Sequence, residues 1–237
     1  MPLPRLLAFS VGSIPAYMLI SMTGVYLPPF YAGKMGISLT AIGATIGLLR
    51  LTDLGLDVAL GWLMDKTRTP MGRYRPWYLA GLPVLWLAVY KVFNPPADVD
   101  TAYLFVWYIL LYVAYSMLVL GHSAWAAAIS GSYNERSRMF GWMLGVGVCG
   151  SSFLGLLPLL THGQITAADA KSMPTIGWII MAVSTVAVVV ATLSVREPVS
   201  RTSPTQRSSL KDFLAVITNP SMFRLVLADL FLVLGPG

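Results

Sequence analysis

Six long apolar stretches, separated by short polar segments, run along this chain. A membrane-spanning α-helix needs about 20 predominantly apolar residues, and each stretch is long enough, the third only just. The pattern therefore predicts an all-α membrane protein whose residues 1–195 form a bundle of six transmembrane helices. The expected helices are Leu7–Tyr31, Ile37–Met64, Trp77–Phe93, Ala102–Ile129, Met139–Leu160 and Thr175–Val195.

The chain changes character after the sixth stretch. Residues 196–218 are polar and predict a cytoplasmic linker, which includes a short amphipathic helix at Ser209–Ile217. A new apolar run begins near Met222 and ends about one residue short of the usual lower bound of 17 for a span. We therefore expect residues 219–237 to be an incomplete seventh transmembrane helix, and the chain to be a fragment of a larger transporter.

Composition argues against a water-soluble fold. Hydrophobic residues make up 56% of the chain and charged residues 11%, whereas a soluble domain usually has about 25% charged residues. The net charge of +6 could suggest nucleic acid as a partner. The basic residues, however, lie in the short segments between apolar stretches, which is typical of membrane topology. The single cysteine, Cys149, allows no disulfide within the chain.

The two sets of loops differ in charge. Most of the sixteen Lys and Arg residues lie before the first stretch, in the second-to-third and fourth-to-fifth loops, and after the sixth stretch. The opposite loops carry only Lys34, Lys91 and Lys171. Because basic loops remain on the cytoplasmic side, this asymmetry predicts a cytoplasmic N-terminus.

Glycines recur with a spacing that lets membrane helices approach closely. Gly43 and Gly47 are four residues apart in the second stretch, and Gly141 and Gly145 are four apart in the fifth, where Gly147, Gly150 and Gly155 follow. Such pairs predict packed helix–helix contacts. Glycine is also simply common in membrane helices, and the pairs identify no solute.

Three ionisable residues, Arg50, Asp53 and Asp57, interrupt the second stretch. Their spacing of three and four places them on one helix face. A charge at this depth costs at least about 2.5–3.5 kcal/mol, so such residues are usually functional. Two acids one turn apart could bind Na⁺ through carboxylate oxygens, or one could hold a proton, with Arg50 as their charge partner. The alternative is a salt bridge that only holds helices together.

The charged face leads into a strongly basic loop, so that residues 50–77 read RLTDLGLDVALGWLMDKTRTPMGRYRPW. This segment resembles the glycoside–pentoside–hexuronide:cation symporters, the melibiose-permease-like branch of the major facilitator superfamily. That family has an Arg, two acids four apart and a Gly, followed by a basic loop that ends in Pro-Trp. The segments YNERSR at residues 133–138 and LKDFLAVITNPSMFRLVL at residues 210–227 resemble the family as well.

The resemblance implies a fold of two six-helix bundles built from three-helix repeats, with this chain as the N-terminal bundle of a major-facilitator-type transporter. It implies a symporter of a small solute, such as a sugar or glycoside, in the plasma membrane (the bacterial inner membrane). The implied partners are the solute, the lipid bilayer and a C-terminal six-helix half. No cofactor is implied beyond the coupling ion, H⁺ or Na⁺.

The resemblance also assigns residues. Asp53 and Asp57 would form the cation site, which is a metal site only if the ion is Na⁺. Gly72 and Pro76 favour a tight, ordered turn in the basic loop. This loop would belong to a cytoplasmic gate, although the topology rule alone could explain its charge. The expected gate residues are Asp65, Arg68, Arg73, Arg75, Glu135 and Arg136.

The chain departs from the family pattern where sugar-transporting members bind solute. Those members have an acid in helix 1, an acid in helix 4 and an arginine in helix 5. Here Ser13 lies near the first place, His122 near the second, and the fifth stretch is uncharged. His122 could relay protons and Trp125 could stack on a ring-shaped solute, or both could be ordinary core residues. The missing helix 4 acid slightly favours H⁺ over Na⁺.

A function of a different class also fits the sequence. The chain could be a non-transporting membrane protein, such as a sensor, or a truncated half-transporter with a binding role. An enzyme is not expected, because the sequence has no nucleophile–base pairing, metal cluster or phosphate-binding loop.

Overall fold

The computed structural model describes residues 1–96, 98–160, 172–197, 219–220 and 224. Within these ranges, the side chains of residues 22, 53, 54, 154 and 157–160 are not described. The chain divides into two units, Met1–Val199 and Ser200–Gly237, and all the helices named below belong to the first. The predicted amphipathic helix at Ser209–Ile217 lies outside the described residues, as does nearly all of the predicted seventh helix.

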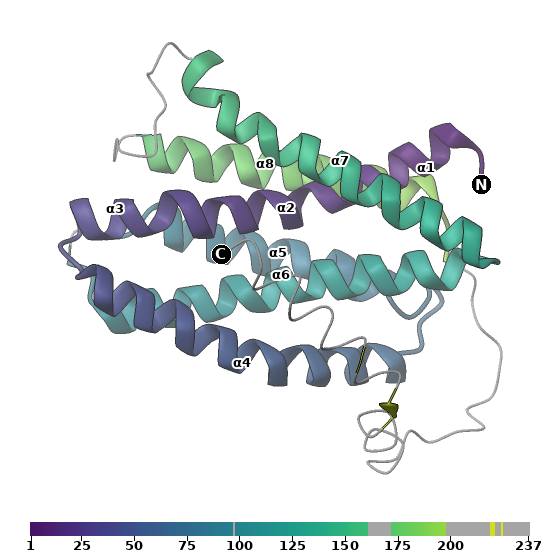
Figure 1. The fold of residues 1–237 in the computed structure, drawn as a ribbon, viewed down its shortest axis with the longest axis horizontal. Coiled ribbons are helices and arrows are strands. Elements are labelled where there is room, and N and C mark those ends of the chain that lie inside the picture. Colours follow the sequence, from purple (N-terminus) through teal and green to yellow (C-terminus); the bar gives the residue numbers. More distant parts are fainter. Residues whose placement is uncertain (97, 161–171, 198–218, 221–223, 225–237) are drawn as a thin grey trace. The chain divides into compact units, whose positions relative to one another are not determined.

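Helices form at all six apolar stretches (Figure 1). The first stretch is three consecutive helical segments, α1, α2 and α3, joined by short turns of different helical pitch. No β-strand is formed in the described part of the chain. The helices are α1 (Leu3–Ser10), α2 (Ile14–Ser21), α3 (Leu27–Lys34), α4 (Leu39–Lys66), α5 (Arg75–Phe93), α6 (Thr101–Ile129), α7 (Tyr133–Leu160) and α8 (Ser172–Ser194).

Prolines explain why the first predicted helix is interrupted. Residues 11–13 form a 3₁₀ turn, in which the Ile14 N–H bonds to the Val11 carbonyl. Pro15 has no N–H to offer that carbonyl, so the tighter bond replaces the α-helical one. Residues 22–26 form a π-type turn directly before Pro28 and Pro29, which remove two further donors. The prediction of one regular helix at Leu7–Tyr31 was therefore wrong in this respect.

Helix α7 begins at Tyr133, earlier than the predicted Met139. Ser132 precedes the helix, its Oγ accepts a hydrogen bond from the Glu135 N–H (3.3 Å), and its carbonyl accepts one from the Arg136 N–H (3.0 Å). A serine followed three residues later by glutamate is a typical helix start. The segment at residues 133–138, which we expected to be a loop, is thus the first turns of α7.

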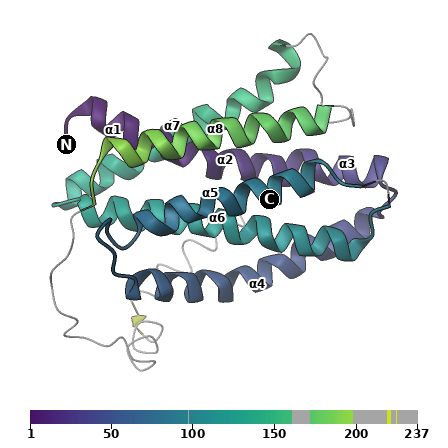
Figure 2. The ribbon, with the colours of Figure 1, turned by 180° about the vertical axis from the view of Figure 1, so that it is seen from behind.

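Neighbouring helices in this unit come from opposite halves of the sequence. The α1–α2 segment packs on α7 and α8, α4 packs mainly on α6, and α5 packs on both α6 and α8. Figure 1 shows the face on which α7 lies in front, and Figure 2 shows the opposite face with α8 in front. The first three predicted helices therefore interlock with the last three, and a large core of buried apolar side chains lies between them, with a smaller cluster at Leu60, Met64 and Met117.

Five segments of the described chain are long and apolar enough to cross a membrane: Leu3–Lys34, Leu39–Lys66, Arg75–Phe93, Thr101–Ile129 and Ser172–Ser194. Helix α7, the remaining predicted span, is not among them, so its crossing of the membrane stays a prediction. Close contacts join the start of α1 to the start of α7, and the start of α5 to Glu197, three residues after the end of α8. The described parts of the predicted cytoplasmic segments are therefore in contact in pairs.

The predicted glycine contacts form at only some of the glycines in this unit. No described atom lies within 4 Å of a Cβ placed at Gly43, Gly47, Gly141 or Gly145. Gly147, two residues after Gly145 on α7, lies directly against the Tyr17 ring, and Gly150 lies against Ile14. The close approach of α7 to α2 therefore depends on these two glycines.

Candidate functional site

A cavity of about 180 Å³ lies beside the 3₁₀ turn of the first helix. Its walls come from α2, α6 and α7 together with the turn itself. Polar lining groups come from Ser13, Tyr17, Tyr115, His122 and Ser123. Two of the predicted solute-site residues, Ser13 and His122, thus share one cavity although 109 positions separate them in the chain.

His122 and Tyr78 are hydrogen-bonded to backbone carbonyls at the break in the first helix. His122 Nε2 lies 3.1 Å from the Phe9 carbonyl oxygen, and Tyr78 Oη donates to the Gly12 carbonyl (2.7 Å). Because a carbonyl only accepts, Nε2 carries the proton in this bond. The two rings are stacked with centroids 5.1 Å apart, so α5 and α6 together hold the interrupted segment of the first helix.

Gly12 is required for this arrangement. A Cβ at Gly12 would lie 2.6 Å from Tyr78 Oη and 3.0 Å from His122 Nε2. Both distances are shorter than normal van der Waals contact. A side chain at this position would therefore push the two hydrogen-bonding groups away from the helix break.

Ser13 joins the turn to α7. Its hydroxyl lies 2.6 Å from the Met143 carbonyl oxygen and 2.8 Å from the Ser10 carbonyl oxygen. Gly147, one turn after Met143, allows this approach, because a Cβ there would lie 3.0 Å from Ser13 Oγ and would collide with Tyr17. The serine that stands near the family's helix 1 acid is thus a hydrogen-bond donor between helices.

Trp125 is not part of the cavity wall. It is fully buried, and its ring packs edge-on against Phe9 at 4.8 Å between centroids. The Arg75 guanidinium lies 5.4 Å from its centroid, a cation–π contact. Its Nε1 has no hydrogen-bond partner in the described part of the chain. In this conformation Trp125 is a core residue, and its contact with a solute stays a prediction.

Arg50 lies next to the cavity at Ser13 and His122. Its guanidinium carbon is 5.7 Å from the centroid of the Tyr112 ring on α6. A small cavity of about 20 Å³ lies here, lined also by Leu19 and Thr23. Ile20 and Tyr115 line both this small cavity and the larger one, so the predicted charge partner and the predicted solute residues share a wall.

Asp57 is partly buried, and its Oδ1 is buried without a hydrogen-bond partner among the described residues. Such an atom is uncommon in folded proteins and calls for an ion, a water or a mobile partner. Asp53 lies one turn earlier on α4, and its side chain is outside the described part. Within that part, no ion pair joins Arg50 to Asp57, and no group of three or more His, Cys, Asp or Glu residues could hold a metal ion.

The basic loop is a tight turn, as predicted. The Gly72 N–H bonds to the Thr69 carbonyl (3.0 Å), and Thr69 Oγ1 donates to the Gly72 carbonyl (2.7 Å). Gly72 has φ of +110°, a conformation that glycine adopts readily. Asp65 accepts a hydrogen bond from Tyr74 Oη (3.0 Å), which ties the end of α4 to the loop. Burial, followed by this hydrogen bond, raises the pKa of Tyr74 above its ordinary value of 10.0.

Sequence reasoning missed Glu197, the residue that organises this loop. Its carboxylate accepts hydrogen bonds from the backbone N–H groups of Arg73 (2.8 Å), Tyr74 (3.0 Å) and Arg75 (3.0 Å). These groups lie at the start of α5, where N–H groups lack helical partners and negative charge is favoured. Glu197 is only 6% exposed, although it lies outside the helices, three residues after the end of α8. One signal was available: α5 starts without a serine, threonine or acid of its own, and so needs an acceptor from elsewhere.

The other predicted gate residues are spread over the same end of the unit. Arg75 Nη2 donates to the Thr192 carbonyl on α8 (2.9 Å), whereas Arg68 and Arg136 are exposed. Glu135 pairs with the N-terminal ammonium of Met1 (3.1 Å). This hydrogen bond is the largest of the contributions that lower the pKa of Glu135. The part of the chain that the structure describes contains no ion pair between two predicted gate residues.

Comparisons with known proteins agree with this architecture. A family model described as "MFS/sugar transport protein" matches residues 8–237. The chain is 27% identical to a protein of Salmonella typhimurium named as a candidate sulfoquinovose importer, over 94% of the chain and 49% of that protein. It is 26% identical to an Escherichia coli protein named as a candidate 2,3-dihydroxypropane-1-sulfonate exporter, over 69% of the chain and 38% of that protein.

A third relative is a lactose permease of Leuconostoc lactis, 25% identical over 92% of the chain and 37% of that protein. The chain thus spans about half the length, or less, of the curated relatives that it matches. Since the family model covers nearly all of its residues, the chain belongs to the family of MFS/sugar transport proteins.

Proposed function

We propose that the protein works as a cation-coupled secondary transporter of a small, sugar-like solute, with H⁺ or Na⁺ as the coupling ion. One observation carries this proposal. The cavity at Arg50 and the cavity at Ser13 and His122 are adjacent, because Ile20 and Tyr115 line both of them. A charged helix face beside a polar cavity is the arrangement that coupling of two transported species needs. Membership of the family supports the same reading.

Asp53 and Asp57 are the proposed cation site, with Arg50 as their partner. The buried, unpaired Oδ1 of Asp57 supports this assignment, because a bound cation would satisfy it. A proton would satisfy it equally well, since a protonated carboxyl group is itself a hydrogen-bond donor. The choice between H⁺ and Na⁺ therefore rests on measurement of coupling rather than on geometry.

The cavity at the helix break is the proposed solute site of this half. Its hydroxyl and imidazole groups suit a polyhydroxy compound, which both donates and accepts hydrogen bonds. At about 180 Å³ it is smaller than the 300–1,000 Å³ usual for ligand sites, which fits a role as one wall of a site completed by a second six-helix half. The names of the relatives suggest sugars and sulfonated polyols as solutes.

The end of the unit that carries Glu197 and the basic loop is the proposed cytoplasmic gate. Asp65, Arg73 and Arg75 belong to an ordered layer there, and Arg68, Glu135 and Arg136 lie at its surface. The excess of basic residues at this end supports a cytoplasmic location of the N-terminus. We place the protein in a plasma membrane, the bacterial inner membrane.

Transport in proteoliposomes tests the coupling. Uptake of labelled lactose, glucuronide and sulfoquinovose is followed under an imposed Na⁺ gradient and, separately, an imposed pH gradient. Asp57→Asn is expected to abolish gradient-driven uptake while solute binding, followed by thermal shift, is retained. Asp98→Asn removes an exposed acid from the loop between α5 and α6 and is the matched control.

Two results would contradict the proposal. Unchanged gradient-driven uptake in both Asp53→Asn and Asp57→Asn would remove the coupling assignment. Solute binding without any uptake would instead favour a non-transporting, sensing role. Ser123→Ala, on the cavity wall, is expected to weaken solute binding by about tenfold, the effect of losing one good hydrogen bond.

A further inference from the structure

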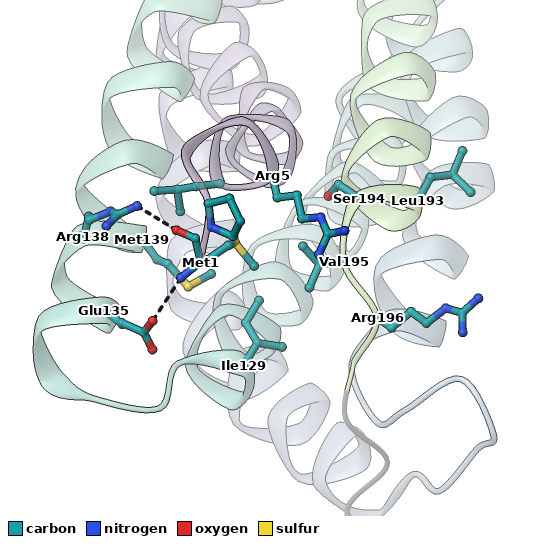
Figure 3. A pocket seen from close by; sticks show the side chains of 12 residues that line it. Met1, Arg5, Ile129, Glu135, Arg138, Met139, Leu193, Ser194, Val195 and Arg196 are labelled. Carbon is teal, nitrogen blue, oxygen red and sulfur yellow. Dashed lines mark hydrogen bonds and ion pairs between the residues drawn. The ribbon is translucent and has the colours of Figure 1, made fainter.

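A larger cavity, of about 630 Å³, lies apart from the proposed solute and cation sites. It is formed where α1 and α7 begin and where α6 and α8 end (Figure 3). No residue lines both this cavity and the cavity at His122. Its volume lies well inside the range of about 300–1,000 Å³ typical of ligand sites.

The charged groups around the cavity are mostly basic. Arg5, Arg138 and Arg196 line it, and Glu135 is its one acidic lining residue. Both carboxylate oxygens of Glu135 are already engaged, Oε1 with the Met1 ammonium (3.1 Å) and Oε2 with the Gly131 N–H (3.2 Å). The positive charge of the arginines is therefore not compensated by the walls of the cavity.

The arginines differ in their engagement. Arg138 Nη2 donates to the Met1 carbonyl (2.9 Å), which leaves its other N–H groups available. Figure 3 shows Arg5 reaching across the cavity towards Ser194 and Val195, with Arg196 at the outer edge. Arg5 and Arg196 have exposed side chains, so both can turn towards an anion.

Apolar side chains line part of the remaining wall. Leu6, Ile129, Met139 and Leu193 provide aliphatic surface next to the arginines. The cavity also lies at the ends of three membrane-spanning segments. Leu3–Lys34 begins beside it, and Thr101–Ile129 and Ser172–Ser194 end beside it. Helix ends of this kind lie at the depth of lipid headgroups. A basic mouth, an apolar wall and this depth together fit an amphiphile with an anionic head.

We propose that this cavity binds the phosphate headgroup of an anionic phospholipid, with Arg5 and Arg138 on the phosphate, Arg196 at the rim and one acyl chain along Ile129 and Leu193. Guanidinium groups bind phosphate oxygens through paired, charge-assisted hydrogen bonds. Basic pockets between transmembrane helices are suited to such headgroups. The bound lipid would join the starts of α1 and α7 to the end of α8.

The test measures lipid binding to the purified protein in detergent. Phosphatidylglycerol is titrated while thermal stability is recorded, and retained lipid is counted by native mass spectrometry. We expect saturable stabilisation by phosphatidylglycerol, little by phosphatidylcholine, and none by inorganic phosphate at the same concentration. Arg5→Gln is expected to weaken phosphatidylglycerol binding by about tenfold, and Arg5→Gln with Arg138→Gln by more.

Arg136→Gln is the matched control. It removes one positive charge from the first turns of α7, where Arg138 also lies, but Arg136 does not line the cavity. Ile129→Trp is a second, independent variant, because it fills the cavity and leaves every charge in place. It too is expected to lose the specific lipid.

Each of the following results would overturn the proposal. Equal stabilisation by phosphatidylcholine would mean a general lipid effect, and equal stabilisation by inorganic phosphate would mean a site for a free anion. An equal loss in Arg136→Gln and Arg5→Gln would mean that only surface charge matters. Unchanged binding in both Arg5→Gln and Ile129→Trp would place the lipid elsewhere. None of these results depends on transport, so they leave the proposed function untouched.

Discussion

The carboxylate of Glu197 and the backbone N–H of Arg73 are separated by 124 positions in the chain and lie 2.8 Å apart. The same carboxylate also bonds to the N–H groups of Tyr74 and Arg75. One acidic side chain thus joins the start of α5 to the segment that follows α8. The basic loop, which we propose as part of a gate, is positioned by an acid outside the loop.

Glu197→Ala is expected to lower the free energy of unfolding by about 2–3 kcal/mol, because three N–H groups at a helix start lose their charged acceptor. Thermal and denaturant unfolding of the purified protein in detergent measures the loss. Glu197→Gln retains one acceptor oxygen and is expected to lose less. Equal stability of Glu197→Ala and the unmodified protein would show that the carboxylate does not hold the loop.

Gly72→Ala tests the turn that faces Glu197. A Cβ at Gly72 would collide with the Glu197 carboxylate, and φ of +110° disfavours any other residue. Gly36 has φ of +68° with no described atom within 4 Å of its Cβ position, so Gly36→Ala isolates the backbone cost, about 1–2 kcal/mol. Gly72→Ala is expected to cost more.

The additional loss of stability in Gly72→Ala, compared with Gly36→Ala, should decrease when the Glu197 side chain is shortened. In a Glu197→Ala background the overlap with the carboxylate is absent and only the contact with the Cβ of residue 197, at 2.8 Å, remains, so Gly72→Ala should cost less than it does in the unmodified protein. Equal costs of Gly72→Ala in both backgrounds would argue against direct contact of Gly72 with the Glu197 side chain. The same unfolding measurement serves all four variants.

Gly147→Ala is expected to destabilise the protein by about 1–3 kcal/mol, because a methyl group there overlaps the Tyr17 ring. Gly141→Ala on the same helix meets no described atom within 4 Å and is expected to be neutral or stabilising by up to about 1 kcal/mol, since alanine is the better helix former. If the two variants lose the same stability, α7 does not pack on α2 through Gly147.

Because of Tyr74, we expect the stability of the protein to fall as the pH rises into the alkaline range. Burial and the hydrogen bond to Asp65 raise its pKa in the folded state above the unfolded value near 10.0. The contribution of Tyr74 to the free energy of unfolding is fully present below pH 10. It is lost as the pH rises through the pKa of Tyr74 in the folded state, because the unfolded chain gives up this proton at a lower pH. Tyr74→Phe should therefore lose less stability between pH 9 and pH 11 than the unmodified protein.

Melting temperatures of both proteins across that range provide the check. Other tyrosines and lysines titrate alike in the two proteins, so the difference between the curves reports Tyr74. Asp65→Asn is expected to fall between them, because it removes the charge next to Tyr74 and leaves the burial. Parallel curves for Tyr74→Phe and the unmodified protein would contradict the assignment.

Local pattern was sufficient to predict where the helices form. Apolar length located all six, and Gly72 with Pro76 predicted the tight turn. Two errors concern signals that are also local: Pro15 marks the break in the first helix, and Ser132 with Glu135 marks the true start of α7. Both follow from backbone donors and caps, so a closer reading of the sequence would have found them.

The contacts that build the candidate site join residues that are far apart in the chain, so local sequence signals did not predict them. His122 was a candidate from its type alone, but its partner, the Phe9 carbonyl, is 113 positions away. The positions of the glycines along α7 did not distinguish Gly147, which packs against Tyr17, from Gly141, which meets no described atom within 4 Å. Such pairings depend on how helices from the two halves of the sequence interlock.

The length of each apolar stretch and the placement of its charges are local properties, because they govern the transfer of one segment into the membrane. They were sufficient to predict the helices, and the motif that they contain indicated the family. The tertiary structure decided which polar groups meet. It directed Glu197 to the start of α5, His122 and Tyr78 to the broken first helix, and Arg50 to a wall shared with the cavity at Ser13 and His122. These contacts depend on distance in space, which packing of the whole bundle sets, and no local pattern encodes it.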